Sequence, residues 1–152
     1  MMPLKSEFLM QIRVELEGSH FLGNTPYGDR RIDFFNGGTF EGPRLKGIVL
    51  PGGSDMQLGR ADGARKPDVR LTLKTDDDAL IQVTYSGIRH GSAEVMKRIA
   101  REEQVDPEEY YLRNTPYFET SADKYEWLNL IVAVGIGARV PDAAIYDIHQ
   151  IL

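Results

Sequence analysis

Two pairs of polar side chains with the chemistry for proton transfer and anion binding stand inside segments of β-strand character. Asp55 and Gln57 are two residues apart, so in a strand they project from the same face. Tyr85 and Arg89 share a face of another strand, with His90 at its end. A carboxyl group, an amide, a phenol and a guanidinium are therefore available to one another if these strands are neighbours.

A second group follows later in the chain. Tyr111 and Arg113 are again two residues apart, and Glu119 and Trp127 come soon after them. An arginine binds a carboxylate through two parallel hydrogen bonds, and a carboxylate or a tyrosine can transfer protons. A buried arginine also requires a partner, because an unpaired buried charge is costly.

These side chains predict one pocket with divided roles. We expect the arginines to hold an anionic or carbonyl group, a carboxyl group to transfer protons, Tyr111 to donate a hydrogen bond and Trp127 to form an apolar wall. The candidate catalytic residues are Asp55, Tyr111 and Glu119, and the candidate ligand-binding residues are Gln57, Tyr85, Arg89, Arg113 and Trp127. The alternative interpretation is that they form ordinary salt bridges and cross-strand pairs.

The chain contains no sequence motif for a metal, dinucleotide or calcium site. His20, His90 and His149 are isolated, and the glycines of Gly135–Gly137 lack the strand–turn–helix context of a dinucleotide site. The aspartates 76–78 lack the spaced ligands of a calcium loop and are typical of a hairpin turn. We therefore predict no metal site and no bound cofactor.

Composition narrows the class of protein. The chain has 152 residues, 41% hydrophobic and 27% charged, which fits a single domain over residues 1–152 with a real core. The net charge of −5 disfavours nucleic acid and anionic membranes as partners, and the clusters Arg30-Arg31 and Lys97-Arg98 are interpreted as solvated surface. There is no cysteine and no signal-peptide pattern, so we expect a cytoplasmic protein.

The elements that must position these residues are mostly strands. Residues 8–16 alternate, with Phe8, Met10, Ile12, Val14 and Leu16 on one face, and Gly18-Ser19 is expected to end that strand. Residues 24–29 read as a loop, residues 30–41 as strand with a bulge or sharp coil at Gly37-Gly38, and residues 45–50 as the next strand. Two alternating runs, 69–74 and 80–85, predict a hairpin across the aspartates.

The last third of the chain adds a helix and more strands. The spacing predicts a helix over 92–103 with Ser92 as N-cap, and one further turn begins at Asp106-Pro107. Residues 110–120, 127–138 and 144–152 are expected to be strands. The segment 127–138 is apolar on both faces, so either the helix or another subunit must cover it, and we expect a homo-oligomer.

Ordered stretches along nearly the whole chain resemble a family of uncharacterised proteins known as DUF3237 or UPF0311. They are residues 37–43, 46–47, 51–55, 75–77, 79–81, 87–91, 110–113, 115–116, 118–120 and 127–129. The resemblance implies a compact antiparallel β-barrel, brings no assigned activity, and points to Asp55, Gln57, Arg89, Tyr111, Arg113 and Glu119. Met56 departs from the family pattern, which has an aromatic residue there that could line the pocket.

Roughly eight or more short strands with one helix indicate a mainly β protein, a sandwich or a barrel. The hairpin order favours an antiparallel β-barrel, because closure removes exposed edges. The leading functional hypothesis is a small-molecule-binding barrel, and possible activities are those of a cofactor-independent isomerase, cyclase or lyase acting on a small organic acid or carbonyl compound. A lipocalin-like carrier and an oligomerisation module are the alternatives.

Overall fold

A computed structural model describes residues 1–152 and shows a closed antiparallel β-barrel, which confirms the predicted fold class. Ten strands, one α-helix and two 3-10 helices make up the chain. In order they are β1 (Ser6–Thr25), β2 (Gly28–Glu41), β3 (Lys46–Val49), β4 (Ser54–Gly59), β5 (Arg65–Lys66), β6 (Asp68–Thr75), β7 (Leu80–Gly91), α1 (Ala93–Ala100), η1 (Pro107–Glu109), β8 (Tyr110–Glu119), η2 (Asp123–Leu130), β9 (Ala133–Val140) and β10 (Ala143–Ile151).

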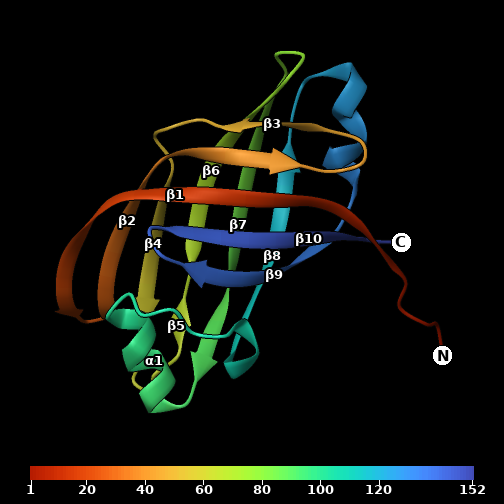
Figure 1. The fold of residues 1–152 in the computed structure, drawn as a ribbon. Coiled ribbons are helices and arrows are strands. Elements are labelled where there is room, and N and C mark those ends of the chain that lie inside the picture. Colours follow the sequence, from red (N-terminus) through yellow and green to blue (C-terminus); the bar gives the residue numbers. More distant parts are fainter.

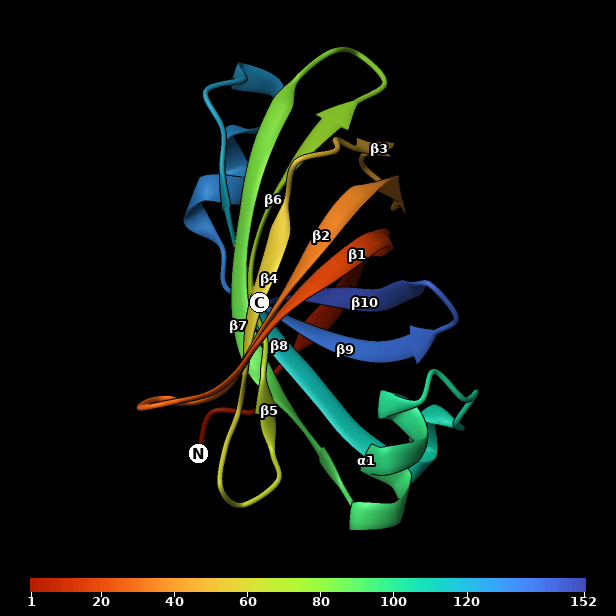
Figure 2. The ribbon, with the colours of Figure 1, turned by 90° about the vertical axis from the view of Figure 1, so that its left-hand side faces the viewer.

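The barrel closes through a ring of antiparallel pairings. β1 pairs with β10, and the ring continues through β9, β8, β7 and β6 to β3 and β4, which pair with β2, and β2 returns to β1. In Figure 1, β1, β2, β9 and β10 run across β6, β7 and β8, so the wall forms two crossed layers around one interior. Figure 2 shows these layers from the side.

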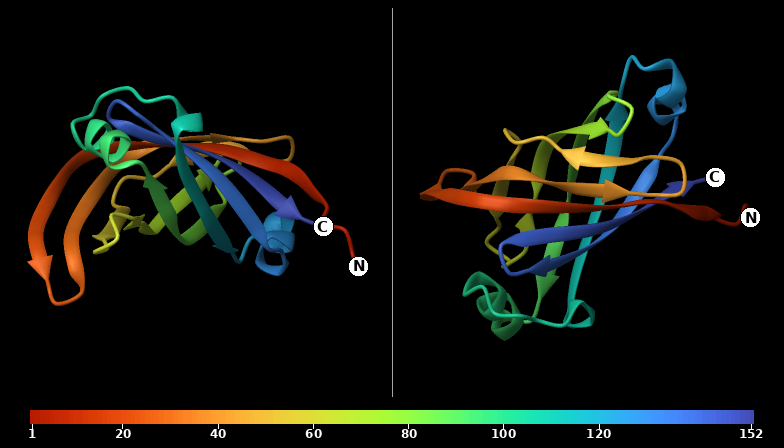
Figure 3. Two further views of the ribbon diagram at one scale, coloured as in Figure 1. Left: turned by 90° about the horizontal axis from the view of Figure 1, so that it is seen from below. Right: turned by 45° about the horizontal axis from the view of Figure 1, so that its top comes forward.

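The first hairpin is longer than predicted. β1 continues through Gly18-Ser19 to Thr25, and β2 begins at Gly28, so only two residues remain of the expected loop. The pairing with β2 holds this extension in place, and the hairpin projects from the barrel body in both views of Figure 3. An irregularity between Phe8 and Met10 reverses the alternation, so that Leu9 is buried and Phe8 is 43% exposed.

Glycine allows β1 and β2 to approach closely where β2 bends. Gly37 and Gly38 have φ of 142° and 148°, a conformation that other residues rarely adopt. A Cβ atom on Gly38 would lie 1.9 Å from the carbonyl oxygen of Arg13. The predicted bulge is therefore confirmed, and residues Phe35 and Phe40 on either side of it both remain buried.

The helical elements lie at opposite ends of the strands β7 and β8 (Figure 1). α1 confirms the predicted helix: the Ser92 hydroxyl accepts a hydrogen bond from the Val95 N–H, and Val95 and Ile99 are buried. The predicted single turn is η1, which is capped by Asp106. The hairpin of β6 and β7 is also confirmed, with Asp78 at positive φ in its turn.

The strand predicted over residues 127–138 is wrong in its first half. Residues up to Leu130 form the 3-10 helix η2, and β9 begins only at Ala133. Leu128 is buried, whereas Leu130 is 86% exposed. The expected subunit interface depended on one strand, apolar on both faces, over residues 127–138, and the structure has no such continuous strand.

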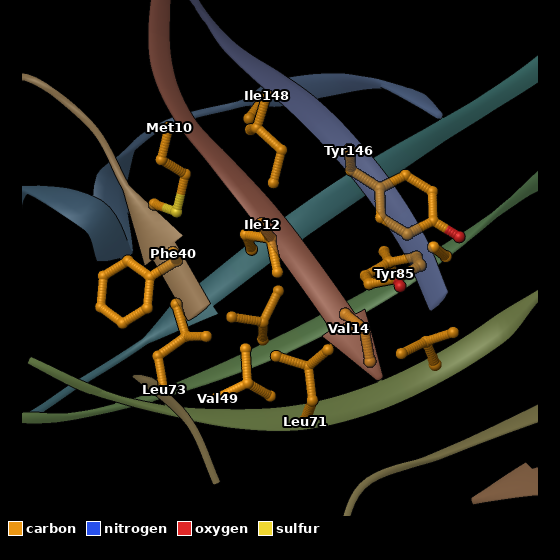
Figure 4. Packing of buried hydrophobic residues seen from close by; sticks show 14 of the residues in the cluster. Met10, Ile12, Val14, Phe40, Val49, Leu71, Leu73, Tyr85, Tyr146 and Ile148 are labelled. Atoms are coloured by element: carbon orange, nitrogen blue, oxygen red, sulfur yellow. The ribbon is translucent and has the colours of Figure 1, made fainter. Parts of the chain in front are cut away.

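The interior has two halves. Apolar, mostly aliphatic side chains fill one, called here the aliphatic half, and polar side chains line the other, the polar half. Met10, Phe40 and Leu73 are almost fully buried in the aliphatic half. Figure 4 shows Tyr85 and Tyr146 on the other side of this cluster, with Val14 nearby. Tyrosines at this position begin the polar half, where the candidate site lies. None of the helices has the length and apolar character required to cross a bilayer.

Candidate functional site

A pocket enters the polar half of the barrel from the end near α1. Its inner part has a volume of about 20 Å³, enough for about one water molecule. The residues that line it are Leu16, Asp33, Phe35, Asp55, Gln57, Arg65, Pro67, Tyr85, Arg89, Leu112, Arg139, Ala144 and Tyr146. A wider cleft of about 390 Å³ lies outside it, between α1, the β1–β2 hairpin and the β4–β5 turn. Arg65, Arg89 and Arg139 line both spaces, so they stand where the cleft meets the inner pocket.

Two carboxyl groups face each other across neighbouring strands in this pocket. Asp33 on β2 is the register partner of Asp55 on β4. Both side chains point inward, because the alternation of each strand places their neighbours Ile32 and Met56 on the other face. Directly opposed side chains on antiparallel strands have Cβ atoms roughly 5 Å apart, so each carboxyl group is part of the other's environment.

Asp33 is surrounded by hydrogen-bond donors. It accepts hydrogen bonds from Arg31 Nε at 2.7 Å and Nη2 at 3.2 Å, from Ser19 Oγ at 2.5 Å and from Gln57 Nε2 at 2.7 Å. Burial alone would raise the pKa of Asp33, but the hydrogen bonds from Arg31 and Ser19 and the charge of Arg31 outweigh it, so the pKa is lowered. Asp33 is therefore held as a carboxylate and its acceptor positions are occupied.

Asp55 has far fewer donors. Its one hydrogen bond comes from the backbone N–H of Asp68, at 2.9 Å from Oδ1. Burial raises the pKa of Asp55 to about 6, and the Asp33 charge adds to this rise. The backbone hydrogen bond and the Arg89 charge counteract it only in part. Asp55 can therefore exchange a proton near neutral pH and has acceptor capacity to spare.

Positive charge and tyrosine hydroxyls complete the inner pocket. Arg89 is 9% exposed, and its Nε has no hydrogen-bond partner. Burial and the neighbouring Arg139 lower the pKa of Arg89 to about 10, so it stays charged at neutral pH. The rings of Tyr85 and Tyr146 meet edge to face at 5.2 Å, and burial raises the pKa of both, that of Tyr146 to about 12. Both phenols are therefore neutral donors.

Four of the eight predicted site residues meet in this pocket: Asp55, Gln57, Tyr85 and Arg89. The shared faces predicted for the pairs on β4 and β7 are confirmed by their burial. Met56 is exposed on the outer face of β4, so the departure at this position does not alter the pocket.

The other four predicted residues lie elsewhere. Tyr111 is 44% exposed on the outer face of β8, where Arg113 stacks on its ring at 4.6 Å. Glu119 is exposed and pairs in register with Gln82, toward the end of β8 that leads to η2. Trp127 lies in η2, and the guanidinium of Arg44 is 3.6 Å from its ring centre. The expectation of one pocket for all eight residues is therefore wrong for these four.

The prediction omitted several residues that line the pocket. Arg31, Asp33 and the buried Phe35 follow one another at a spacing of two on β2, so they share a face. This spacing was the available signal for an inward position of Asp33 and Arg31. Arg31 was interpreted as surface, but it lines the cleft and binds Asp33. Tyr146 carried the same signal, because it lies between Ala144 and Ile148 at a spacing of two on β10, whereas Arg65 and Arg139 carried none. Among the His, Asp and Glu side chains, no group of three or more is arranged to hold a metal ion.

The fold and this pocket define a closed antiparallel barrel with a pair of facing carboxyl groups in a pocket at one end. The family model described as "Protein of unknown function (DUF3237)" matches residues 4–151. The chain therefore belongs to this family, as the resemblance predicted.

Related proteins align with this chain along nearly their whole length. A UPF0311 protein of Rhodopseudomonas palustris is 34% identical over 149 residues, which cover 98% of this chain and 97% of that protein. The crystal structure of a conserved protein of unknown function from the same species has a TM-score of 0.94, with both chains fully covered. A β-barrel-like protein of Acinetobacter baumannii is 44% identical with a TM-score of 0.86, covering 99% of this chain and 97% of that one.

A more distant relative bears the name of an enzyme. The hydroalkoxylation enzyme phnH of Penicillium herquei is 24% identical over 153 residues, covering 98% of this chain and 85% of that protein. A crystal structure of an enzyme from the same fungus has a TM-score of 0.73 at 24% identity and covers 99% of this chain and 96% of that one. At this identity the structural likeness concerns the fold alone.

Proposed function

We propose that this protein is a cofactor-independent enzyme that catalyses proton-transfer chemistry on a small organic acid or carbonyl compound, as an isomerase, cyclase or lyase. One observation carries the proposal: the facing carboxyl groups Asp33 and Asp55 have pKa values shifted in opposite directions. Two titratable groups whose pKa values are driven apart in one pocket are the usual arrangement of an acid–base site.

The roles follow from the hydrogen bonds. Asp33 is saturated by donors, so it positions Arg31 and Gln57 and does not exchange protons. Asp55, with one backbone donor and a pKa of about 6, is the proton-transfer group. Arg89 and the two tyrosines supply donors for oxygen atoms on which negative charge develops.

The name of the fungal relative suggests one reaction that this set of groups can perform. In the addition of a hydroxyl group to a conjugated C=C bond, the Asp55 carboxylate removes the hydroxyl proton. The oxygen bonds to the β carbon, the π electrons move to the carbonyl oxygen, and the hydroxyls of Tyr85 and Tyr146 stabilise that oxyanion. Asp55 then returns the proton to the α carbon, so that the product is an isomer of the substrate and no redox partner is consumed.

The experiment measures cyclisation of an ortho-hydroxychalcone, whose internal hydroxyl adds to a conjugated C=C bond, by the loss of its visible absorbance. We expect a rate above that in buffer for the parent protein and for Asp76→Asn, a matched change at an exposed turn. Asp55→Asn, which keeps the shape and loses the proton-transfer group, is expected to reduce the rate by about 100-fold or more. An equal rate in Asp55→Asn, or none above buffer in the parent, would count against a cyclase.

Asp55 would transfer protons in any of the three reaction classes, so its ionisation is the common requirement. Tyr111 and Glu119, which were candidate catalytic residues, receive no role because they lie outside the pocket. A lipocalin-like carrier would need a large apolar cavity, and no such cavity supports this alternative, because apolar side chains fill the aliphatic half of the interior. A homo-oligomer remains a prediction.

A further inference from the structure

Two arginines face each other at the entrance to the inner pocket. Arg65 on β5 is the register partner of Arg89 on β7. Like charges directly opposite on antiparallel strands repel each other, so this pairing costs free energy. A third arginine, Arg139, lines the same space with its side chain 11% exposed.

Each of the facing arginines has a hydrogen-bond donor that nothing satisfies. The Nη2 of Arg65 and the Nε of Arg89 are buried without partners. Nε of Arg65 donates to Gln57 at 2.5 Å and Nη1 to Asp29 at 3.1 Å, so its remaining donor is the unused one. Buried donors are rarely left without an acceptor, and an unsatisfied one in a pocket indicates a ligand position.

The surroundings indicate the shape of the ligand. The inner pocket of about 20 Å³ has room for a small group only, whereas the cleft outside is about 390 Å³. Phe21, Met96 and Ile99 contribute apolar surface to the cleft. A ligand that fills both spaces has a small charged end at the arginines and a larger, partly apolar body in the cleft.

We propose that Arg65 and Arg89 form a clamp for the carboxylate of an amphipathic organic acid, whose apolar body occupies the cleft beside α1. A planar carboxylate matches the fork of a guanidinium, and two such forks give it charge and direction. The clamp deepens the proposed function, on which it rests, by naming the class of substrate. It also accounts for the tolerated cost of facing like charges, because the bound anion compensates for both.

The test is a calorimetric titration in chloride-free buffer with benzoate and with benzamide, its neutral isostere. The parent protein is expected to bind benzoate about tenfold more tightly than benzamide. Arg89→Met and Arg65→Met are expected to weaken the affinity for benzoate by about tenfold or more and to change the affinity for benzamide by less than about threefold. Lys66→Met, a matched loss of an exposed cation beside Arg65 that lines neither the pocket nor the cleft, is expected to change benzoate binding by less than about threefold.

Thermal unfolding of the unliganded variants separates a binding role from a structural one. Arg89→Met removes a buried charge without a partner, so its Tm is expected to equal or exceed that of the parent. Equal affinity for benzoate and benzamide, unchanged benzoate binding in Arg89→Met, or an equal loss in Lys66→Met would overturn the clamp. If Arg89→Met does not fold, Arg89→Lys, which keeps charge but lacks the fork, decides the point by the same benzoate titration.

Asp55→Asn distinguishes the clamp from the proposed catalytic role. This variant is expected to keep benzoate binding, because Asp55 is not part of the clamp, while it loses the cyclisation rate. Failure of benzoate discrimination with an Asp55-dependent rate would overturn the clamp alone. Benzoate discrimination with no Asp55-dependent rate would leave the clamp and overturn the proposed reaction.

Discussion

The same strands build both halves of the barrel interior, yet the halves hold opposite kinds of side chain. β2 contributes Phe40 to the aliphatic half and Asp33 to the polar half, and β7 contributes Ile81 to the first and Arg89 to the second. All four point inward, and on β2 the bulge beside Gly37 allows Asp33 and Phe40, seven residues apart, to share the inner face. What differs is position along the strand: one half is closed by packing, and the other meets a cleft from which a ligand can enter.

The difference separates stability from function. Aliphatic packing stabilises the barrel through burial and dispersion, whereas buried charges cost free energy unless they are paired. Asp33 with Arg31 is fully paired, but Asp55 and Arg89 are not. The unpaired groups are therefore the ones that a functional account must explain, and variants of the two halves are expected to behave in opposite ways.

The largest expected effect is in the aliphatic half. Phe40→Ala removes a side chain that is 2% exposed and leaves a cavity, so we expect a loss of about 4 kcal/mol in the free energy of unfolding. Urea unfolding followed by circular dichroism measures it. Benzoate affinity of the folded fraction is expected to remain that of the parent, and a loss of less than about 1 kcal/mol would show that this half is not the stabilising one.

The second effect has the opposite sign. The native protein binds the Asp55 proton more tightly than the unfolded chain does. The free energy of unfolding therefore falls as the pH rises from 3.8 to about 6, and above pH 6 the cost of burying the Asp55 carboxylate is fully present. Asp55→Asn removes it, so we expect a gain of up to roughly 3 kcal/mol at pH 8 that shrinks as the pH falls toward 4. Urea unfolding across this range measures the gain, and a pH-independent difference would contradict the raised pKa.

Asp33→Asn should do the reverse at the facing position. The lowered pKa means that the carboxylate contributes stability above pH 3.8, and that this contribution is lost as the pH falls through its folded value. Removing the charge leaves Arg31 without its partner, so we expect a loss of about 2 kcal/mol at pH 7. Paired unfolding curves of Asp33→Asn and Asp55→Asn give the two signs, and equal signs would remove the distinction between the two carboxyl groups.

The smallest effect is expected on the outer surface. Arg113→Met removes a stacking contact with the half-exposed Tyr111, so the free energy of unfolding should change by about 0.5 kcal/mol. Benzoate affinity should not change, because Arg113 is not in the pocket. Weaker benzoate binding by this variant would restore the role that the sequence pattern assigned to Arg113.

Alternation was sufficient to predict much of the barrel, and it failed where periodicity carries no information. Residues 127–130 are a short run, apolar except for Asn129, so a strand and a 3-10 helix fit them equally well. Gly18-Ser19 is a turn signal in isolation, but pairing with β2 carries the strand through it. The bulge near Phe8 likewise depends on the pairing with β10.

The site shows a similar limit. The spacing predicted that Asp55 and Gln57 share a face, and that Tyr85 and Arg89 share another, but not which way each face points. Both of these pairs point inward, whereas Tyr111 and Arg113 share a face that points outward. The buried Leu112 and Asn114 between and after them held the signal for that orientation, since they take the inward positions of β8. The facing pairs Asp33–Asp55 and Arg65–Arg89 depend on the register between strands, which one sequence does not reveal.

The measurement that tests the central claim most directly is a pH titration of the aspartate carboxyl carbons by NMR, with Asp33→Asn and Asp55→Asn used to assign the two signals. We predict that Asp55 titrates near pH 6 and that Asp33 titrates below 3.8. Titration of Asp55 near pH 4, the ordinary range of an aspartate, would contradict its proposed role as the proton-transfer group.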